Sequence, residues 1–211
     1  MILMLPGPNR IIKCPYCQNQ LRQGTLASGN TFGATFWTDG KREAPMLPDS
    51  VIVSYCEECN NFFWVEDAEL IDKVEFDSDE YPDAEFLKEL TLEQYIEAFK
   101  KMEVKNDEGI LYLLKQIWWK YNDYYRNDEQ EKIPQNIEKR MPALLDELLD
   151  ILNENNDDHL MLKGELLREL GKFEEALEKF NKIKDPEYDN AKKYIIDLAE
   201  KGISELRELK I

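Results

Sequence analysis

Cys14-Pro15-Tyr16-Cys17 is the most informative stretch of the sequence, together with its repeat at Cys56-Glu57-Glu58-Cys59. Both stretches have the spacing C-x-x-C, which allows two thiolates from one tight turn to bind the same tetrahedral ion at about 2.3 Å. Two such turns complete four-coordination, so the sequence predicts one structural Zn²⁺ ion bound by Cys14, Cys17, Cys56 and Cys59. Four thiolates leave no open coordination position, and we therefore expect the metal to hold the fold and not to activate water.

Two other uses of the cysteines stay open at this point. A redox dithiol of the thioredoxin sort requires a βαβ setting around one active pair, whereas here two pairs lie among predicted strands and turns. Iron is the second rival, since four thiolates also suit an iron centre or an iron-sulfur cluster. The 38 residues between Cys17 and Cys56 exceed the commonest spacing, and we expect an extended hairpin to take up the excess.

The region around the cysteines is β in character. Thr35-Phe36-Trp37-Thr38 is a predicted strand, Asp39-Gly40 a two-residue hairpin turn, and Lys41-Arg42 the start of the returning strand. Two further strand candidates, Val51–Tyr55 and Phe62–Val65, flank the second cysteine pair. We expect residues 1–70 to form a small β domain.

Beyond Glu66 the apolar residues change to helical spacing, and the sequence predicts an α+β protein. Residues 71–90 are expected to be an acidic linker or loop, and residues 91–211 an α-helical domain. Thr91 is the predicted N-cap of the first helix, which extends to Lys101. The other predicted helical segments are 108–126, 142–152, a helical hairpin over 160–186, and 188–209.

The chain is acidic, with 27 Lys and Arg residues, 44 Asp and Glu residues, and a net charge of -17. Residues 1–65 contain five basic and five acidic side chains, so the acidity belongs to the remainder. Such a surface repels nucleic acid, which we expect not to be a partner. The apolar opening Met1–Leu5 lacks the layout of a signal peptide and no long apolar span follows, which predicts a cytoplasmic protein without a membrane segment.

The two cysteine motifs resemble the knuckles of the zinc-ribbon class, although Gln18-Asn19 and Asn60-Asn61 occupy the places where glycine is common. This resemblance implies a module of transcription, of ribosome-associated factors or of protein docking. The segment Leu160–Pro186 resembles one tetratricopeptide repeat. The whole layout is similar to that of uncharacterised bacterial proteins that join a split C-x-x-C ribbon to a repeat-like helical tail, and this likeness implies no activity. The packing positions of the repeat correspond to Gly164, Leu167, Gly171, Phe173, Ala176 and Phe180.

Aromatic residues in the helix predicted over 108–126 belong mostly to its core face. We expect Trp118 to be buried with Tyr121 and Tyr125, and Trp119 or Tyr124 to contact the ribbon or a partner. The single histidine, His159, has no nucleophile within reach in the sequence and is expected to be a surface residue.

These observations predict a non-catalytic scaffold or adaptor that binds a protein or peptide through its helical domain, and they indicate no catalytic residues. The main alternative is association with nucleic acid or the ribosome through Lys13, Arg22, Lys41 and Arg42. A C-x-x-C dithiol redox enzyme is the second alternative.

Overall fold

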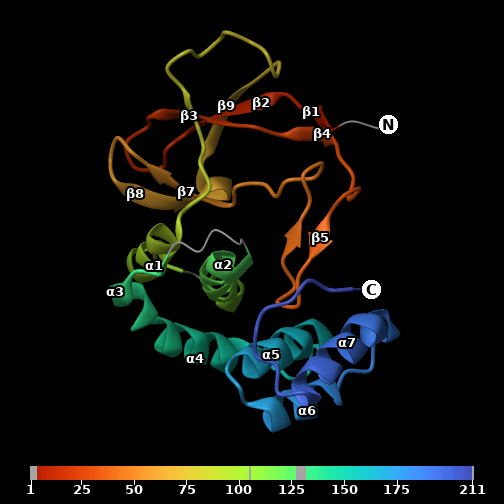
Figure 1. Cartoon of the computed structure of the whole chain (residues 1–211). Coiled ribbons are helices and arrows are strands. Elements are labelled where there is room, and N and C mark those ends of the chain that lie inside the picture. The colour runs from red at the N-terminus through yellow and green to blue at the C-terminus, as the bar shows by residue number, and fades with distance from the viewer. Residues whose placement is uncertain (1–3, 105, 127–131, 211) are drawn as a thin grey trace. The chain divides into compact units, whose positions relative to one another are not determined.

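The computed structural model describes residues 4–104, 106–126 and 132–210. Residues 1–3, the start of the apolar opening, lie outside the described residues. Within them the strands precede residue 87 and the α-helices follow residue 91, which confirms the α+β class (Figure 1). The chain divides into two compact units. Unit 1 contains residues 1–34 and 43–103, and unit 2 contains residues 35–42 and 104–211.

Unit 1 is built on a four-stranded sheet in the order β10-β3-β2-β9. Strand β2 is antiparallel to both of its neighbours, and β10 is parallel to β3. A second hairpin, β7-β8, carries the second cysteine pair. The elements of unit 1 are β1 (Leu5–Pro6), β2 (Asn9–Lys13), β3 (Gln20–Gln23), β4 (Leu26–Ser28), β7 (Val53–Cys56), β8 (Asn61–Trp64), η1 (Val65–Asp67), β9 (Glu69–Val74), β10 (Glu85–Phe86) and α1 (Leu92–Lys101).

Residues 71–90, expected as a linker or loop, instead contain most of β9 and all of β10, and both strands belong to the main sheet. The acidic turn between them is held from inside the unit by Arg22. Arg22 is buried, with 6% of the residue exposed. Its guanidinium group donates to the backbone carbonyls of Ser78, Glu80 and Tyr81. The acceptors are backbone carbonyls, so the types of the side chains in this segment do not reveal these contacts. The sequence therefore indicated a loop.

Helix α1 begins as predicted. The Thr91 hydroxyl accepts a hydrogen bond from the Gln94 backbone N–H, and the Gln94 side chain accepts one from the Thr91 backbone N–H. This reciprocal pair satisfies two N–H groups that a helix start leaves without intrahelical acceptors.

Unit 2 contains the remaining helices of the described residues. Helices α2, α4 and the pair α5-α6 lie where the apolar spacing predicts helices. Helix α7 ends at Glu200, so the expected helix over 188–209 is wrong beyond that residue; Gly202, at φ +65°, follows the helix end. The elements are β5 (Thr35–Phe36), β6 (Arg42–Glu43, whose last residue falls in unit 1), α2 (Asp107–Arg126), α3 (Gln135–Glu138), α4 (Met141–Ile151), α5 (Asp157–Glu169), α6 (Phe173–Phe180), η2 (Pro186–Tyr188) and α7 (Asp189–Glu200).

Helices α5 and α6 form the close helical hairpin expected from their small residues. A methyl group at Gly164 would lie 2.5 to 2.9 Å from ring atoms of Phe180, too close for any side chain. Ala176 is fully buried, and Gly171 adopts φ +73° in the connection. These small residues therefore set the separation of the two helices.

The hairpin β5-β6 has a three-residue turn in place of the predicted two-residue turn. The Trp37 N–H donates to the Lys41 carbonyl at 2.9 Å and the Gly40 N–H to the Trp37 carbonyl at 3.0 Å, with Gly40 at φ +78°. Only the glycine takes the left-handed conformation, as in a turn closed by a bulge. On its other side the hairpin pairs with the C-terminal segment, where the Leu209 N–H donates to the Phe36 carbonyl at 2.7 Å.

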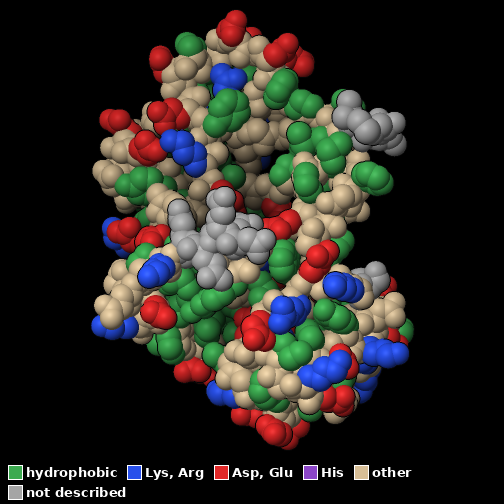
Figure 2. Space-filling view, viewed as in Figure 1, with side chains coloured by type: hydrophobic (Ala, Val, Ile, Leu, Met, Phe, Trp, Pro, Cys, Tyr) green, Lys and Arg blue, Asp and Glu red, His purple; other side chains and the backbone are tan. Residues whose placement is uncertain are grey.

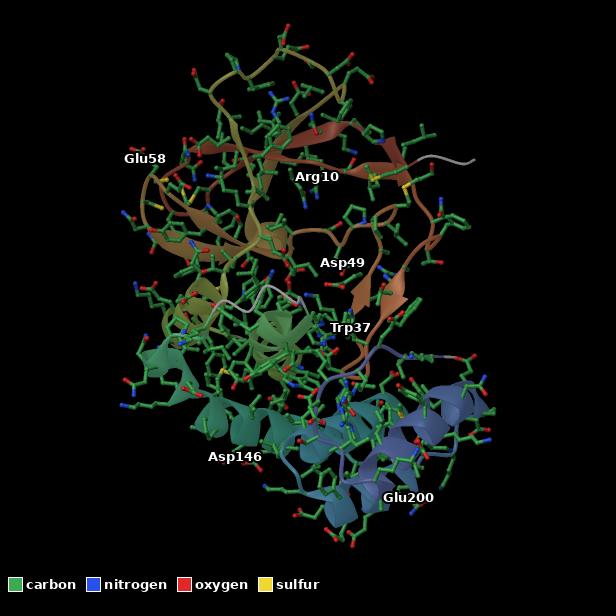
Figure 3. The ribbon with its side chains drawn as sticks, in the orientation of Figure 1. Arg10, Trp37, Asp49, Glu58, Asp146 and Glu200 are labelled. Atoms are coloured by element: carbon green, nitrogen blue, oxygen red, sulfur yellow. The ribbon has the colours of Figure 1, made fainter. Side chains whose placement is uncertain are left out.

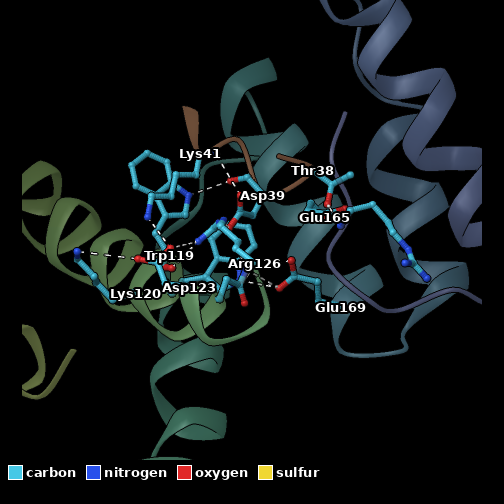
Figure 4. A network of polar contacts seen from close by, with 12 residues as sticks. Thr38, Asp39, Lys41, Trp119, Lys120, Asp123, Arg126, Glu165 and Glu169 are labelled. Atoms are coloured by element: carbon cyan, nitrogen blue, oxygen red, sulfur yellow. Dashed lines mark hydrogen bonds and ion pairs between the residues drawn. The ribbon is translucent and has the colours of Figure 1, made fainter. Parts of the chain in front are cut away.

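The tip of this hairpin is anchored by Asp39, whose side chain is fully buried (Figure 4). Its carboxylate forms an ion pair with Arg126 and accepts a hydrogen bond from the Asn122 amide at 2.9 Å. The indole N–H of Trp119 donates to the Asp39 backbone carbonyl at 3.0 Å. Trp119 thus contacts a hairpin that was expected in the β domain but belongs to unit 2, and the anchor fixes this hairpin to α2.

A second buried ion pair continues the same network. Arg168 is fully buried and binds Glu165 with two nitrogen–oxygen distances of 2.7 and 2.6 Å. It also donates to the carbonyl of Glu205, in the segment after α7, at 3.1 Å. Burial, with the charges of Glu165 and Asp39, raises the pKa of Glu169 well above its ordinary value, although Trp118 donates to its carboxylate at 2.7 Å.

The aromatic face of α2 follows the expectation only in part. Trp118 is fully buried, and its indole N–H donates a hydrogen bond to the Glu169 carboxylate. Tyr121 is half-buried, and the prediction for Tyr125 was wrong because this side chain is 53% exposed. The hydroxyl groups of the two tyrosines lie 3.3 Å apart, so the helix end presents them to solvent as a polar pair.

The buried charge of Asp39 makes unit 2 sensitive to the loss of its cation. We expect Arg126→Met to lower the free energy of unfolding by about 3 to 5 kcal/mol, because it leaves a buried carboxylate without a counter-charge. Asp39→Asn in the same chain is expected to recover part of the loss. Urea unfolding followed by far-ultraviolet circular dichroism measures both.

The matched control is Arg207→Met, which removes an exposed guanidinium 3.8 Å from Glu205. Its expected effect is below about 0.5 kcal/mol. Equal losses for the two arginine variants, or no recovery in the double variant, would contradict the anchoring role of Asp39.

Candidate metal centre

Two similar turns present the cysteines. In the first, the Cys14 N–H donates to the Asn19 carbonyl at 2.8 Å and the Gln18 N–H to the Cys14 carbonyl at 3.0 Å. In the second, the Asn60 N–H donates to the Cys56 carbonyl at 2.8 Å. Gln18 and Asn60, each directly after its second cysteine, adopt φ values of +66° and +58°. The left-handed conformation thus occurs where zinc knuckles commonly have glycine, and asparagine tolerates it better than glutamine does.

The four cysteine sulfurs converge on one point. Cys14 Sγ lies 3.7 Å from Cys59 Sγ, Cys17 Sγ lies 3.7 Å from Cys56 Sγ, and all four lie within 4.8 Å of one another. A regular tetrahedron of sulfurs at about 2.3 Å from a central ion has edges of about 3.8 Å. The observed separations therefore fit one four-coordinate ion. They are far from the roughly 2.05 Å of a disulfide, and the cysteines are free.

Each turn contributes one buried and one more accessible sulfur. Cys14 and Cys56 are buried, Cys59 is half-buried and Cys17 is exposed. Glu58, which Figure 3 labels, is exposed and lies between Cys56 and Cys59 in the second turn. Cys14 and Cys56 belong to the apolar core of unit 1, with Ile12, Leu21, Phe63 and Val65. An ion at this position would thus join the two cysteine turns and the core around them.

The surroundings shift the pKa values of Cys14 and Cys59 in opposite directions. Burial raises the pKa of Cys14 to about 12, against the opposing effect of the N–H groups of Cys17 and Tyr16. Cys59 is also desolvated, but hydrogen bonds from the side chain and backbone of Asn61 lower its pKa to about 7. The sequence analysis placed Asn61 only at a position where glycine is common and did not predict that it would donate to a cysteine of the second knuckle. Such N–H donors disperse the charge of bound thiolates.

The basic residues considered for nucleic-acid binding are divided between the two units. Lys13 and Arg22 belong to unit 1, while Lys41 and Arg42 belong to unit 2. Arg22 is buried against backbone carbonyls, and the Lys41 ammonium lies 2.5 Å from the Asp123 carboxylate. The arrangement therefore offers no cluster of exposed cations from these four side chains within either unit.

His159 is half-buried and has a local role. Its Nδ1 accepts a hydrogen bond from the Asn153 backbone N–H at 3.0 Å, next to the start of α5.

Among the described residues, no helix combines the length and the apolar character that a bilayer crossing requires.

Comparison with protein-family models, with curated proteins and with solved structures finds no match to this chain.

The exposure difference between the cysteines allows a sharp test of metal binding. We expect about one metal ion per chain, and we expect Cys17→Ser and Cys56→Ser to lose it alike, because each removes one of four ligands. Elemental analysis of the purified full-length variants gives the metal content, and near-ultraviolet circular dichroism follows the packing of unit 1.

A packing role alone would give a different result. Cys56 is buried and Cys17 is exposed, so only Cys56→Ser would then disturb the fold. Full metal content in Cys17→Ser would contradict a four-cysteine site. The far-ultraviolet helical signal, which comes mainly from unit 2, is the internal control and should persist in both variants.

Proposed function

We propose that this protein is a zinc-stabilised, non-catalytic adaptor that binds a protein or peptide partner through its helical unit. The observation that carries the proposal is the convergence of four cysteine sulfurs within 4.8 Å. Thiolates that fill all four positions of a zinc ion leave none for water or substrate, so the ion serves the fold.

The size of the cluster favours a single metal ion over an iron-sulfur cluster. In a cubane iron-sulfur cluster each cysteine binds a different iron atom, which requires the thiolates to surround several atoms. Sulfurs with two separations of 3.7 Å enclose room for one ion. A catalytic dithiol needs one reactive pair, whereas here each short contact joins a cysteine of one turn to a cysteine of the other. Thiolate ligands of this kind also suit a reducing compartment, and we include the cytoplasm in the proposal.

The partner site that we propose is a groove of about 450 Å³ in unit 2. Leu111 and Trp119 of α2 line it together with Leu162 of α5 and Ile195 of α7. Leu111, Trp119 and Leu162 are half-buried, so apolar surface is available to an incoming side chain. Concave apolar sites with a few polar groups at the edge are the usual places for such contacts.

Charge supports a protein partner over a nucleic acid. Residues 66–211 carry the whole net charge of -17. Asp and Glu side chains are distributed over the face drawn in Figure 2, with Lys and Arg side chains among them. A phosphate backbone that approached this surface would be repelled over most of it.

The proposal is tested by affinity capture with the tagged full chain and its groove variant Leu111→Glu. We expect the variant to lose a partner that the unaltered chain retains, with affinity at least about tenfold weaker, because a carboxylate enters an apolar contact. Leu170→Glu is the matched control, since Leu170 is 37% exposed and lies outside the groove. Metal analysis of the same samples verifies that the zinc content is unchanged.

Equal recovery of every captured protein by the two variants would contradict binding at this groove. A milder change, Leu111→Ala, keeps the test decisive if Leu111→Glu lowers the melting temperature. Saturable binding of duplex or single-stranded oligonucleotides near physiological salt would contradict the adaptor function.

A further inference from the structure

Unit 1 has a groove of its own, beside the two cysteine turns. It measures about 540 Å³. The second cysteine turn supplies one part of its lining, through Tyr55, Glu57 and Glu58, and Asn19 follows the first cysteine turn. The remaining lining comes from residues 83 and 85–91 and from Gln94 of α1, with Leu21 at its base. The groove therefore lies between the cysteine turns and the edge of the main sheet.

The charge of this groove is strongly one-sided. Five carboxylate side chains line it, while Lys88 is the single cation among its described lining residues. Lys88 lies 2.9 Å from the Glu57 carboxylate, and the described lining remains acidic overall. The carboxylates are Glu57, Glu58, Asp83, Glu85 and Glu89. Low-dielectric walls focus the potential of such a set and attract cationic groups.

The second observation concerns the backbone of β10, the edge strand of the four-stranded sheet. The Leu87 N–H donates to the Arg22 carbonyl of β3 at 2.8 Å. Because successive N–H groups of a strand point in opposite directions, the N–H and C=O of Phe86 face away from β3, toward the free edge. The Phe86 ring is 55% exposed and has the Arg22 guanidinium 5.4 Å from its centre. The edge strand β10 therefore borders the acidic groove. The backbone groups of Phe86 can pair with an added strand, and the Phe86 ring offers it an aromatic surface.

We propose that this groove binds an extended, basic peptide segment, which adds to the sheet as a strand beside β10. Backbone hydrogen bonds to Phe86 supply the alignment, as in other cases of strand addition. Alternate Lys or Arg side chains of the segment then reach the groove carboxylates, and apolar side chains between them contact Phe86.

This surface goes beyond the adaptor function, because it lies in unit 1 and uses charge, whereas the groove proposed above lies in unit 2 and is apolar. The two proposals therefore fail independently. The cysteine turn carries Glu57 and Glu58, so a chain without its metal is expected to bind the basic segment more weakly.

The probe is a fluorescein-labelled peptide of about ten residues that alternates lysine and valine. Fluorescence anisotropy with the full-length protein, at about 150 mM salt, should show saturable binding that weakens as the salt concentration rises. Glu85→Lys with Glu89→Lys should weaken it at least about tenfold, since both changes reverse charges in the groove. Glu66→Lys with Glu75→Lys is the matched control, because both residues are exposed, belong to unit 1 and lie outside the groove.

Two further probes separate strand addition from simple attraction between a cation and an acidic protein. A glutamate-valine peptide of the same length should not bind. Spermine, which has the charge but no peptide backbone, should displace the labelled peptide only at much higher concentration than the unlabelled peptide does. The melting temperatures of the two double variants show that both are folded.

Equal affinities of the groove variant and the control variant would overturn the proposal, since the attraction would then come from the net charge of the chain. Displacement by spermine as effective as by the unlabelled peptide would also overturn it, because the backbone of the segment would contribute nothing. The absence of saturable binding by the zinc-loaded chain would have the same consequence.

Discussion

Four sulfur atoms held within 4.8 Å of one another are the constraint on which unit 1 depends. Thiolates at this separation repel one another unless a cation lies between them, and two of the four cysteines are part of the apolar core. Structural zinc in finger peptides contributes an apparent 10 to 16 kcal/mol or so, which equals or exceeds the net stability of a typical domain, roughly 5 to 15 kcal/mol. A zinc ion bound by these cysteines would therefore dominate the folding of this small β unit.

Unit 2 depends on a different interaction, the buried carboxylate of Asp39. It is placed by a hairpin that lies between the two cysteine pairs in the sequence, so this unit is assembled from two separate parts of the chain. Arg126 forms an ion pair with the carboxylate and Asn122 donates a hydrogen bond to it. Arg168 binds the C-terminal segment, which pairs with the hairpin. The same hairpin and C-terminal segment contribute Thr38, Gly40 and Leu209 to the apolar groove. The polar network thus shapes the surface that we propose for partner binding.

Local signals in the sequence predicted much of this architecture. The C-x-x-C spacing identified the four cysteines whose sulfurs lie together, Thr91 marked the start of α1, and Gly164 with Ala176 indicated the helical hairpin. These features succeeded because residues a few positions apart determine them. Pairings between distant segments were missed. Strand β9 alternates charged and apolar residues too irregularly to be recognised, yet it pairs with β2, some 60 residues earlier.

The end of α7 and the position of the β5-β6 hairpin were also not predicted, because both depend on pairing between segments that are distant in the sequence. The segment after Gly202 still shows helical spacing of apolar residues, but its backbone pairs with Phe36 and Thr38, about 170 residues away. The Asp39-Gly40 sequence predicted a turn and not where that turn would dock. That information lies in Asn122 and Arg126, whose role as partners emerges only in three dimensions.

X-ray absorption spectroscopy at the zinc edge of the purified full-length protein tests the central claim most directly. We expect a first shell of four sulfur atoms at about 2.3 Å around a single zinc ion. Nitrogen or oxygen atoms in that shell, a second metal atom close to the first, or a protein that folds without bound zinc would contradict it.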